Sequence, residues 1–222
     1  MANIDVLVGE EAFPLNATLA AFLDSLYYVD IASYDPSFPG FQYQEQQKYR
    51  LFNTTRILSA PCTAAYPDPA DQWKCQFGQY RMPFVTTRYL VLTAQFDGYQ
   101  LPYLTGVGST SQYNASVTAY AVEFGNLTVT EFTALSQSNA VTGPPRARVV
   151  NGFYSWACYN HDVSDSATFY DGSCKTNDNI TMNDALRVFL NTTGASKDAQ
   201  SAVTSIDHCS GYACGTYCGN NK

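Results

Sequence analysis

The sequence is short of charged side chains, and of basic ones in particular. Charged residues make up 14% of the 222 positions, with 12 Lys and Arg against 19 Asp and Glu and a formal net charge of −7. Binding to nucleic acid depends on clustered Lys and Arg that neutralise phosphates, and a polybasic membrane surface depends on the same side chains. The chain has no basic run. This composition argues against nucleic acid as a partner and against a polybasic membrane-binding module.

Long apolar runs are also missing. No stretch of 18 or more apolar residues occurs, so we expect no transmembrane helix. The first residues, MANIDVLVGEEAF, have neither the basic start nor the long apolar stretch of a secretory signal peptide. The rest of the chain is nevertheless rich in uncharged polar residues, as secreted proteins often are. We therefore expect a secreted, extracellular or cell-wall protein whose signal peptide is not part of this sequence.

Two further features support a secretory route. Six N-x-[ST] motifs predict glycosylation, and their asparagines are Asn16, Asn53, Asn114, Asn126, Asn179 and Asn191. Seven cysteines are candidates for disulfides, a number typical of oxidising compartments: Cys62, Cys75, Cys158, Cys174, Cys209, Cys214 and Cys218. Because the count is odd, we expect the partner of one cysteine to lie outside this sequence.

The apolar pattern predicts an α/β fold. Hydrophobic residues make up 45% of the chain, which is enough for the core of one domain. Three apolar stretches, at 27–33, 87–94 and 146–156, predict strands, and none alternates cleanly, as expected of strands buried on both faces of a parallel sheet. Apolar residues at helical spacing predict helices around 15–26, 117–124 and 182–190. Asn16 is a candidate cap for the first, and Thr181 with Asp184 a capping pair for the last.

Two side chains that can do acid–base chemistry follow neighbouring predicted strands. Asp97 follows the second strand and His161 the third, where functional groups of open α/β sheets gather. In α/β-hydrolases the order along the chain is nucleophile, acid and histidine, so the pair matches the last two members. The alternative is structural: Asp97 forms a turn with Gly98, and His161 only lies near a structural cysteine. No G-x-S-x-G motif supplies a nucleophile, and GVGSTSQ, at 106–112, comes after Asp97.

Several stretches resemble, in the same order, motifs of the pectin acetylesterase family, which includes the Notum carboxylesterases. They are ANIDVLV, YYVDIASYD, the C-x12-C segment closing with WKCQFG, FDGYQL, ACYNH and the terminal DHCSGYACGTYC. The resemblance extends over nearly the whole chain. The C-x-x-H after a strand and the final cysteine pattern are its most specific parts.

The resemblance implies a secreted serine carboxylesterase of the α/β-hydrolase type that uses no cofactor or metal. Asp97 matches the family's catalytic acid and His161 its catalytic base, while the serine precedes the first matched stretch. Residues 1–222 would then be one partial domain, the C-terminal half of the enzyme, with a disulfide-rich tail from about 205 to 222. We expect this chain alone to be inactive. The implied substrate is an acetyl ester of a pectin-like polysaccharide or an acyl ester of a protein.

Other interpretations stay open from the residues. A secreted, disulfide-rich binding module without a catalytic serine is one alternative. A zinc site at His208, Cys209, Cys214 and Cys218 is another, but a single cluster in a chain with many glycosylation motifs favours disulfides. Cys62 and Cys75 are close enough in sequence to pair. Cys158 would pair with Cys174 or with a tail cysteine, and the full connectivity cannot be deduced from sequence.

Overall fold

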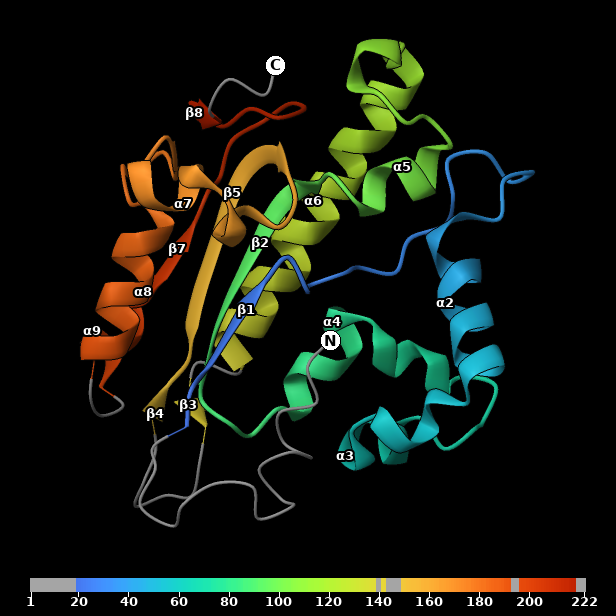
Figure 1. Ribbon diagram of the computed structural model, residues 1–222, viewed down its shortest axis with the longest axis horizontal. Coiled ribbons are helices and arrows are strands. Elements are labelled where there is room, and N and C mark those ends of the chain that lie inside the picture. Colours follow the sequence, from blue (N-terminus) through green and yellow to red (C-terminus); the bar gives the residue numbers. More distant parts are fainter. Residues whose placement is uncertain (1–18, 139–140, 143–148, 193–195, 219–222) are drawn as a thin grey trace.

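The structure is a computed structural model that describes residues 19–138, 141–142, 149–192 and 196–218 (Figure 1). The strands are β1 (Ala21–Asp24), β2 (Tyr89–Asp97), β3 (Val141–Thr142), β4 (Val149–Val150), β5 (Gly152–Asn160), β6 (Cys174–Lys175), β7 (Thr204–Ile206) and β8 (Tyr217–Cys218). The α-helices are α2 (Gly40–Phe52), α3 (Ala60–Ala65), α4 (Gly78–Arg81), α5 (Gln100–Thr105), α6 (Ala115–Ser138), α7 (Ala167–Asp171), α8 (Met182–Asn191) and α9 (Lys197–Ala202). Short 3-10 helices are η1 (Thr54–Ile57), η2 (Gln72–Gln76), η3 (Met82–Phe84), η4 (Thr110–Gln112) and η5 (Val163–Asp165).

The main sheet has the strand order β1-β2-β5-β7, and every neighbouring pair in it is parallel. All nine residues of β2 are buried, which is why this strand is a nearly continuous apolar run rather than an alternating one. Two small antiparallel pairs, β3–β4 and β6–β8, lie outside this sheet. The structure thus confirms the predicted α/β fold with a mostly parallel sheet flanked by helices.

Each face of the sheet packs against a different helix. On one face Tyr89 and Val91 of β2 share a core with Phe124 and Phe132 of α6. On the other face the alternate residues of β2, such as Leu90, pack with buried residues of α8. Figure 1 shows α6 and α8 on opposite sides of the sheet, with α2, α3 and α4 gathered beyond α6. With both faces covered, polar groups are left to gather at the ends of the strands.

Three predicted elements are confirmed. β2 extends the predicted strand to Asp97, and α6 extends the predicted helix from 124 to Ser138. α8 covers the predicted helix at 182–190, and its N-terminus carries the predicted capping pair. Thr181 Oγ1 accepts a hydrogen bond from the Asp184 N–H, and the Asp184 carboxylate accepts one from the Thr181 N–H. In each of these segments the apolar pattern extends over enough residues to distinguish a helix from a strand.

The predicted strand at 27–33 is wrong, and so is the helix in the described part of 15–26. The strand is β1, which lies six residues earlier, and Asn16 falls outside the described residues. Side chains from 21 to 30 alternate between buried and partly buried, so the whole segment is extended. After β1 its backbone pairs with side-chain amides instead of a strand: Val29 N–H donates to Gln100 Oε1 (3.3 Å) and Asp30 N–H to Gln79 Oε1 (2.8 Å).

The third predicted strand, at 146–156, is found as two strands within its described residues. The structure has the short β4 there and then β5, which runs four residues past the predicted end. Residues 146–148 lie outside the described residues. Between the predicted strands, the structure also has α2, α3 and α5, which the apolar pattern did not predict. The helices α3 and α5 are too short to show a repeating apolar pattern.

Three disulfides form among the seven cysteines: Cys62–Cys75, Cys158–Cys218 and Cys209–Cys214. Of the two partners expected for Cys158, the tail cysteine is the one observed. Cys174, also a disulfide candidate, is instead a buried free thiol across the β6–β8 pair from Cys218. Burial raises the pKa of the Cys174 thiol to about 12, so this sulfur is held protonated.

In the described part of the tail, the cysteines form disulfides and not a zinc site. The three tail sulfurs are all in disulfides, and His208 is exposed. Across the described ranges, no group of three or more His, Cys, Asp or Glu side chains is arranged to hold a metal ion.

The glycosylation motifs that can be placed lie on the surface. The asparagines that the structure describes are all exposed, namely Asn53, Asn114, Asn126, Asn179 and Asn191. In the portion of the chain covered by the structure, no helix is both long and apolar enough to cross a membrane.

The two tail disulfides should differ in their contribution to stability. Cys158 and Cys218 are 60 residues apart, against 5 for Cys209 and Cys214. In the chain-entropy description the long loop contributes about 4 kcal/mol and the short one about 2 kcal/mol. We expect Cys158→Ala/Cys218→Ala to lower the free energy of unfolding in urea by more than the matched Cys209→Ala/Cys214→Ala variant. Equal losses, or a larger loss for the short loop, would contradict this pairing.

Candidate active site

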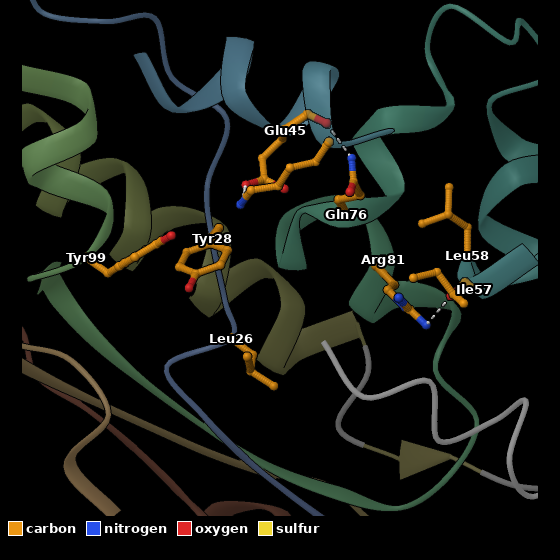
Figure 2. Close-up of a pocket in the computed structure, with 9 residues that line it drawn as sticks. Leu26, Tyr28, Glu45, Ile57, Leu58, Gln76, Arg81 and Tyr99 are labelled. Carbon is orange, nitrogen blue, oxygen red and sulfur yellow. Dashed lines mark hydrogen bonds and ion pairs between the residues drawn. The ribbon is translucent and has the colours of Figure 1, made fainter. Parts of the chain in front are cut away.

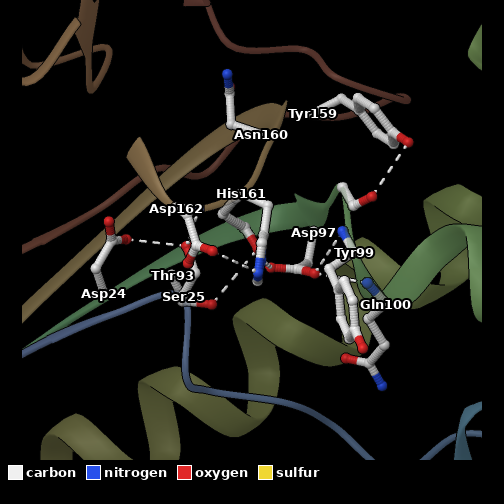
Figure 3. A network of polar contacts seen from close by, with 12 residues as sticks. Asp24, Ser25, Thr93, Asp97, Tyr99, Gln100, Tyr159, Asn160, His161 and Asp162 are labelled. Carbon is white, nitrogen blue, oxygen red and sulfur yellow. Dashed lines mark hydrogen bonds and ion pairs between the residues drawn. The ribbon is translucent and has the colours of Figure 1, made fainter. Parts of the chain in front are cut away.

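Asp97 and His161 meet at the carboxyl edge of the main sheet (Figure 3). Asp97 is the last residue of β2, and His161 directly follows Asn160, the last residue of β5. Nδ1 of His161 lies 2.9 Å from Oδ2 of Asp97. The register of the two strands shifts by one residue between Ala94 and Phe96, so β5 has an extra residue there. Such bulges re-aim side chains near a strand end.

The Asp97 carboxylate uses its two oxygens for different tasks. Oδ1 accepts hydrogen bonds from the backbone N–H groups of Tyr99 (2.9 Å) and Gln100 (2.7 Å), at the start of α5. Oδ2 faces His161. A turn with Gly98 was the alternative to a role of Asp97 beside the histidine. The structure has both the turn and the contact with His161. The turn holds a carboxylate that is only 3% exposed, so its orientation toward the ring is fixed.

Two aromatic side chains pack against the His161 ring. The Tyr99 ring stacks at a centroid distance of 5.2 Å and the Tyr28 ring at 6.4 Å, both nearly parallel to the imidazole. The His161 side chain is 20% exposed, so it remains accessible from one side. Its second nitrogen, Nε2, lies 3.3 Å from Oδ2 of Asp162, whose side chain is 63% exposed.

Burial and charge act in opposite directions on His161. Burial of the ring is the largest single effect and lowers its pKa. The hydrogen bond to Asp97 and the charges of Asp97, Asp162 and Asp24 raise the pKa, and together they outweigh burial. The pKa of His161 is therefore raised above its ordinary value. The Tyr28 hydroxyl, buried beside these carboxylates, also has a raised pKa and stays protonated.

In neutral His161 the two carboxylates compete for one ring proton. Asp97 is buried, whereas solvent screens the exposed Asp162, so the stronger hydrogen bond is the one to Asp97. This places the proton on Nδ1 and leaves the Nε2 lone pair free to accept another. That is the arrangement of a general base held by a carboxylate. The catalytic roles of both residues remain predictions.

Five contributors to the site were not predicted: Tyr28, Tyr99, Asp162, Asp24 and Ser25. The only signal in the sequence was proximity, since Tyr99 and Asp162 are close in sequence to the predicted pair. Ser25 follows β1 at the same edge of the sheet. Its hydroxyl donates a hydrogen bond to Asp24 Oδ1 (2.9 Å). It also accepts one from the Asp162 N–H (2.9 Å).

A cavity of about 310 Å³ adjoins the two stacked tyrosines (Figure 2). Tyr28 and Tyr99 lie at one end, and Arg81 lies across the cavity with Ile57 and Leu58. The full lining is Leu26, Tyr28, Glu45, Lys48, Ile57, Leu58, Gln76, Arg81 and Tyr99. Four of these nine side chains are charged or carry an amide.

The chain matches one family profile and is similar in fold to solved structures. The sequence profile named Pectinacetylesterase matches residues 3–219. Two crystal structures of the Wnt deacylase Notum from Drosophila match the fold, with TM-scores of 0.71 and 0.70 at 22% and 21% sequence identity. Each match covers 97% of this chain and 53% of the Notum chain, so the present sequence spans about half the length of those proteins. No curated protein sequence matches the chain.

The raised pKa of His161 predicts a pH-dependent contribution to stability. A group whose pKa is raised by folding stabilises the fold fully below its unfolded value, about 6.5 for histidine, and this contribution is lost as pH rises through the folded value. We expect His161→Gln to lower the free energy of unfolding more at pH 5.5 than at pH 8.5, measured by urea titration. His208→Gln, at the exposed second histidine, is the control. A loss that grows with pH would show that the sign is wrong.

Proposed function

The chain belongs to the pectinacetylesterase family, and on that premise we propose that it carries the acid and base of a secreted serine carboxylesterase. The observation that supports this most is the 2.9 Å contact between Nδ1 of His161 and Oδ2 of the buried Asp97. It leaves Nε2 turned away from Asp97, where a serine hydroxyl would have to approach. The disulfides and the exposed glycosylation motifs are consistent with an extracellular location.

The proposed reaction is acyl transfer in two steps. His161 takes the proton of a serine hydroxyl as it attacks the ester carbonyl, and returns that proton to the leaving alcohol. Water, activated by the same ring, then releases the carboxylic acid from the acyl-serine. Asp97 orients the ring and stabilises the imidazolium that forms in each step. The serine is proposed to lie outside these 222 residues, because they contain no G-x-S-x-G motif.

The cavity favours a short acyl group on a polysaccharide over a long acyl chain on a protein. Glu45 and Arg81 are buried in its lining, 7% and 5% exposed. Glu45 pairs with Lys48, and Arg81 donates to the Ile57 carbonyl, so a fatty acyl chain would shield paired but charged groups from water, which is costly. Saccharide hydroxyls and carboxylates can form hydrogen bonds with such groups, and the rings of Tyr28 and Tyr99 offer flat faces for a sugar. We therefore favour an acetyl ester of a pectin-like polymer as the substrate.

A non-catalytic binding module derived from the esterase fold is the second candidate. The missing nucleophile motif favours it, since an acid and a base without a serine cannot form an acyl-enzyme. Upstream coding sequence separates the two proposals. An in-frame serine elbow before Met1 supports the esterase, and a signal peptide there without an elbow supports the binding module.

The isolated chain should not turn over esters. We expect purified residues 1–222 to hydrolyse p-nitrophenyl acetate no faster than the His161→Ala variant, because no activated serine is available. In a longer protein that includes the serine elbow, Asp97→Asn should lower kcat about 10⁴-fold. Turnover by the isolated chain that His161→Ala abolishes would contradict the proposal that the nucleophile lies elsewhere.

The cavity should bind an acidic saccharide in preference to a fatty acid. We expect an acetylated galacturonic acid oligomer to shift the NMR signals of Tyr28, Gln76 and Tyr99 in the isolated chain, and dodecanoate to leave them in place. Tyr170, an exposed tyrosine outside the lining, serves as the control signal. Stronger shifts with dodecanoate would favour the long acyl substrate.

A further inference from the structure

His161 is held through its neighbours on both sides in the chain, as well as through its ring. On one side, the carbonyl of Asn160 accepts a hydrogen bond from the Gly98 N–H (2.9 Å), just after β2. On the other side, the N–H of Asp162 donates to Ser25 Oγ (2.9 Å), just after β1. Two parallel strands besides β5 thus secure the backbone around the histidine.

The contact from β1 involves two side chains that act together. Asp24 Oδ2 accepts a hydrogen bond from the Ser164 N–H (2.7 Å), and Asp24 Oδ1 accepts one from the Ser25 hydroxyl (2.9 Å). The Ser25 oxygen is thereby oriented to accept from Asp162 (Figure 3). Ser25 is 1% exposed, and its own N–H donates to the Leu92 carbonyl of β2 (3.0 Å). A backbone hydrogen bond therefore connects the Asp24–Ser25 pair to the main sheet.

Two residues of this network adopt a backbone conformation that is unfavourable for their type. Ser25 has φ 55° and Asp162 has φ 49°, both in the left-handed region where glycine is preferred. Such conformations persist only where surrounding contacts stabilise them, and they are common at functional sites. The hydrogen bond from the Asp162 N–H to Ser25 Oγ joins these two residues directly.

We propose that Asp24 and Ser25 are positioning residues for His161, fixing the loop that follows it so that Asp162 faces Nε2. This inference rests on the proposed function, in which Nε2 exchanges its proton with the serine. The three contacts to Asp24 and Ser25 act on backbone N–H groups and on a hydroxyl, so neither residue needs to touch a substrate. With the loop fixed, the ring stays between Asp97 and the side from which a substrate can approach.

The proposal has a measurable consequence for protonation. The charged and titratable groups around the ring are Asp97 from β2, Asp162 from its own loop, Asp24 from β1, and the hydroxyls of Tyr28 and Tyr99. Asp162 is the member that the pair positions through its backbone. Loss of the Ser25 hydroxyl should let Asp162 move away from Nε2, which lowers the pKa of His161.

The experiment titrates His161 by NMR in the isolated chain, so it does not depend on hydrolysis. The chain has only two histidines, and His208 provides an internal reference signal. Ser25→Gly is the main variant, because glycine accepts φ 55° without strain and lacks the CH2OH group that carries the hydroxyl. Ser164→Ala is the matched control, since it keeps the backbone N–H that Asp24 accepts. Amide hydrogen exchange at Asp162 is recorded for each variant.

In Ser25→Gly we expect the titration of His161 to shift to lower pH and the Asp162 amide to exchange faster, with both unchanged in Ser164→Ala. If Ser25→Gly does not fold, Asp24→Asn should accelerate amide exchange at Ser164 and Asp162. Exchange is the readout for this variant, because loss of the Asp24 charge by itself lowers the pKa of His161. A folded Ser25→Gly chain with the native titration and native exchange would overturn the proposal. That result would not affect the proposed esterase function. Conversely, inactivity of a longer protein with an intact serine elbow would contradict the esterase function, but it would not bear on these contacts.

Discussion

The contact between Asp97 and His161 depends on three parallel strands ending at the same edge of one sheet. β1, β2 and β5 are neighbours with aligned directions, so the residues that follow them converge although they are far apart in sequence. Both faces of the sheet are covered by apolar helix contacts, which leaves this edge as the place where polar side chains meet. The sequence order of Asp97 before His161 follows from the order of the strands.

A buried carboxylate is costly unless its oxygens find partners. Asp97 meets this condition with two backbone N–H groups at the start of α5 and with the imidazole. Asp24 is only partly buried, and its partners are the Ser25 hydroxyl and a backbone N–H of the histidine loop. Both carboxylates therefore form local contacts, Asp97 with the His161 ring and Asp24 with the loop that follows it. The same hydrogen bonds that satisfy the charges define the geometry of the site.

Much of this arrangement could be predicted from sequence. β2, α6 and α8 have long apolar patterns that determine their type, and Asp97 and His161 were found because each follows a predicted strand. β1 was misplaced because its alternation continues into an extended segment whose backbone pairs with glutamine side chains, which no local pattern reveals. Asp24 and Ser25 were missed for the same reason, since their roles consist of contacts to residues about 140 positions away. The choice of Cys218 as the partner of Cys158 also depends on tertiary structure.

The proposed chemistry requires that Asp97 hold the proton of neutral His161 on Nδ1 and leave Nε2 free as a base. A ¹H–¹⁵N NMR spectrum of the His161 side chain, recorded above its pKa, tests this most directly. We expect a proton on Nδ1, strongly deshielded by its hydrogen bond to Asp97, and an unprotonated Nε2. A neutral ring protonated on Nε2, paired with Asp162 and not with Asp97, would contradict this expectation.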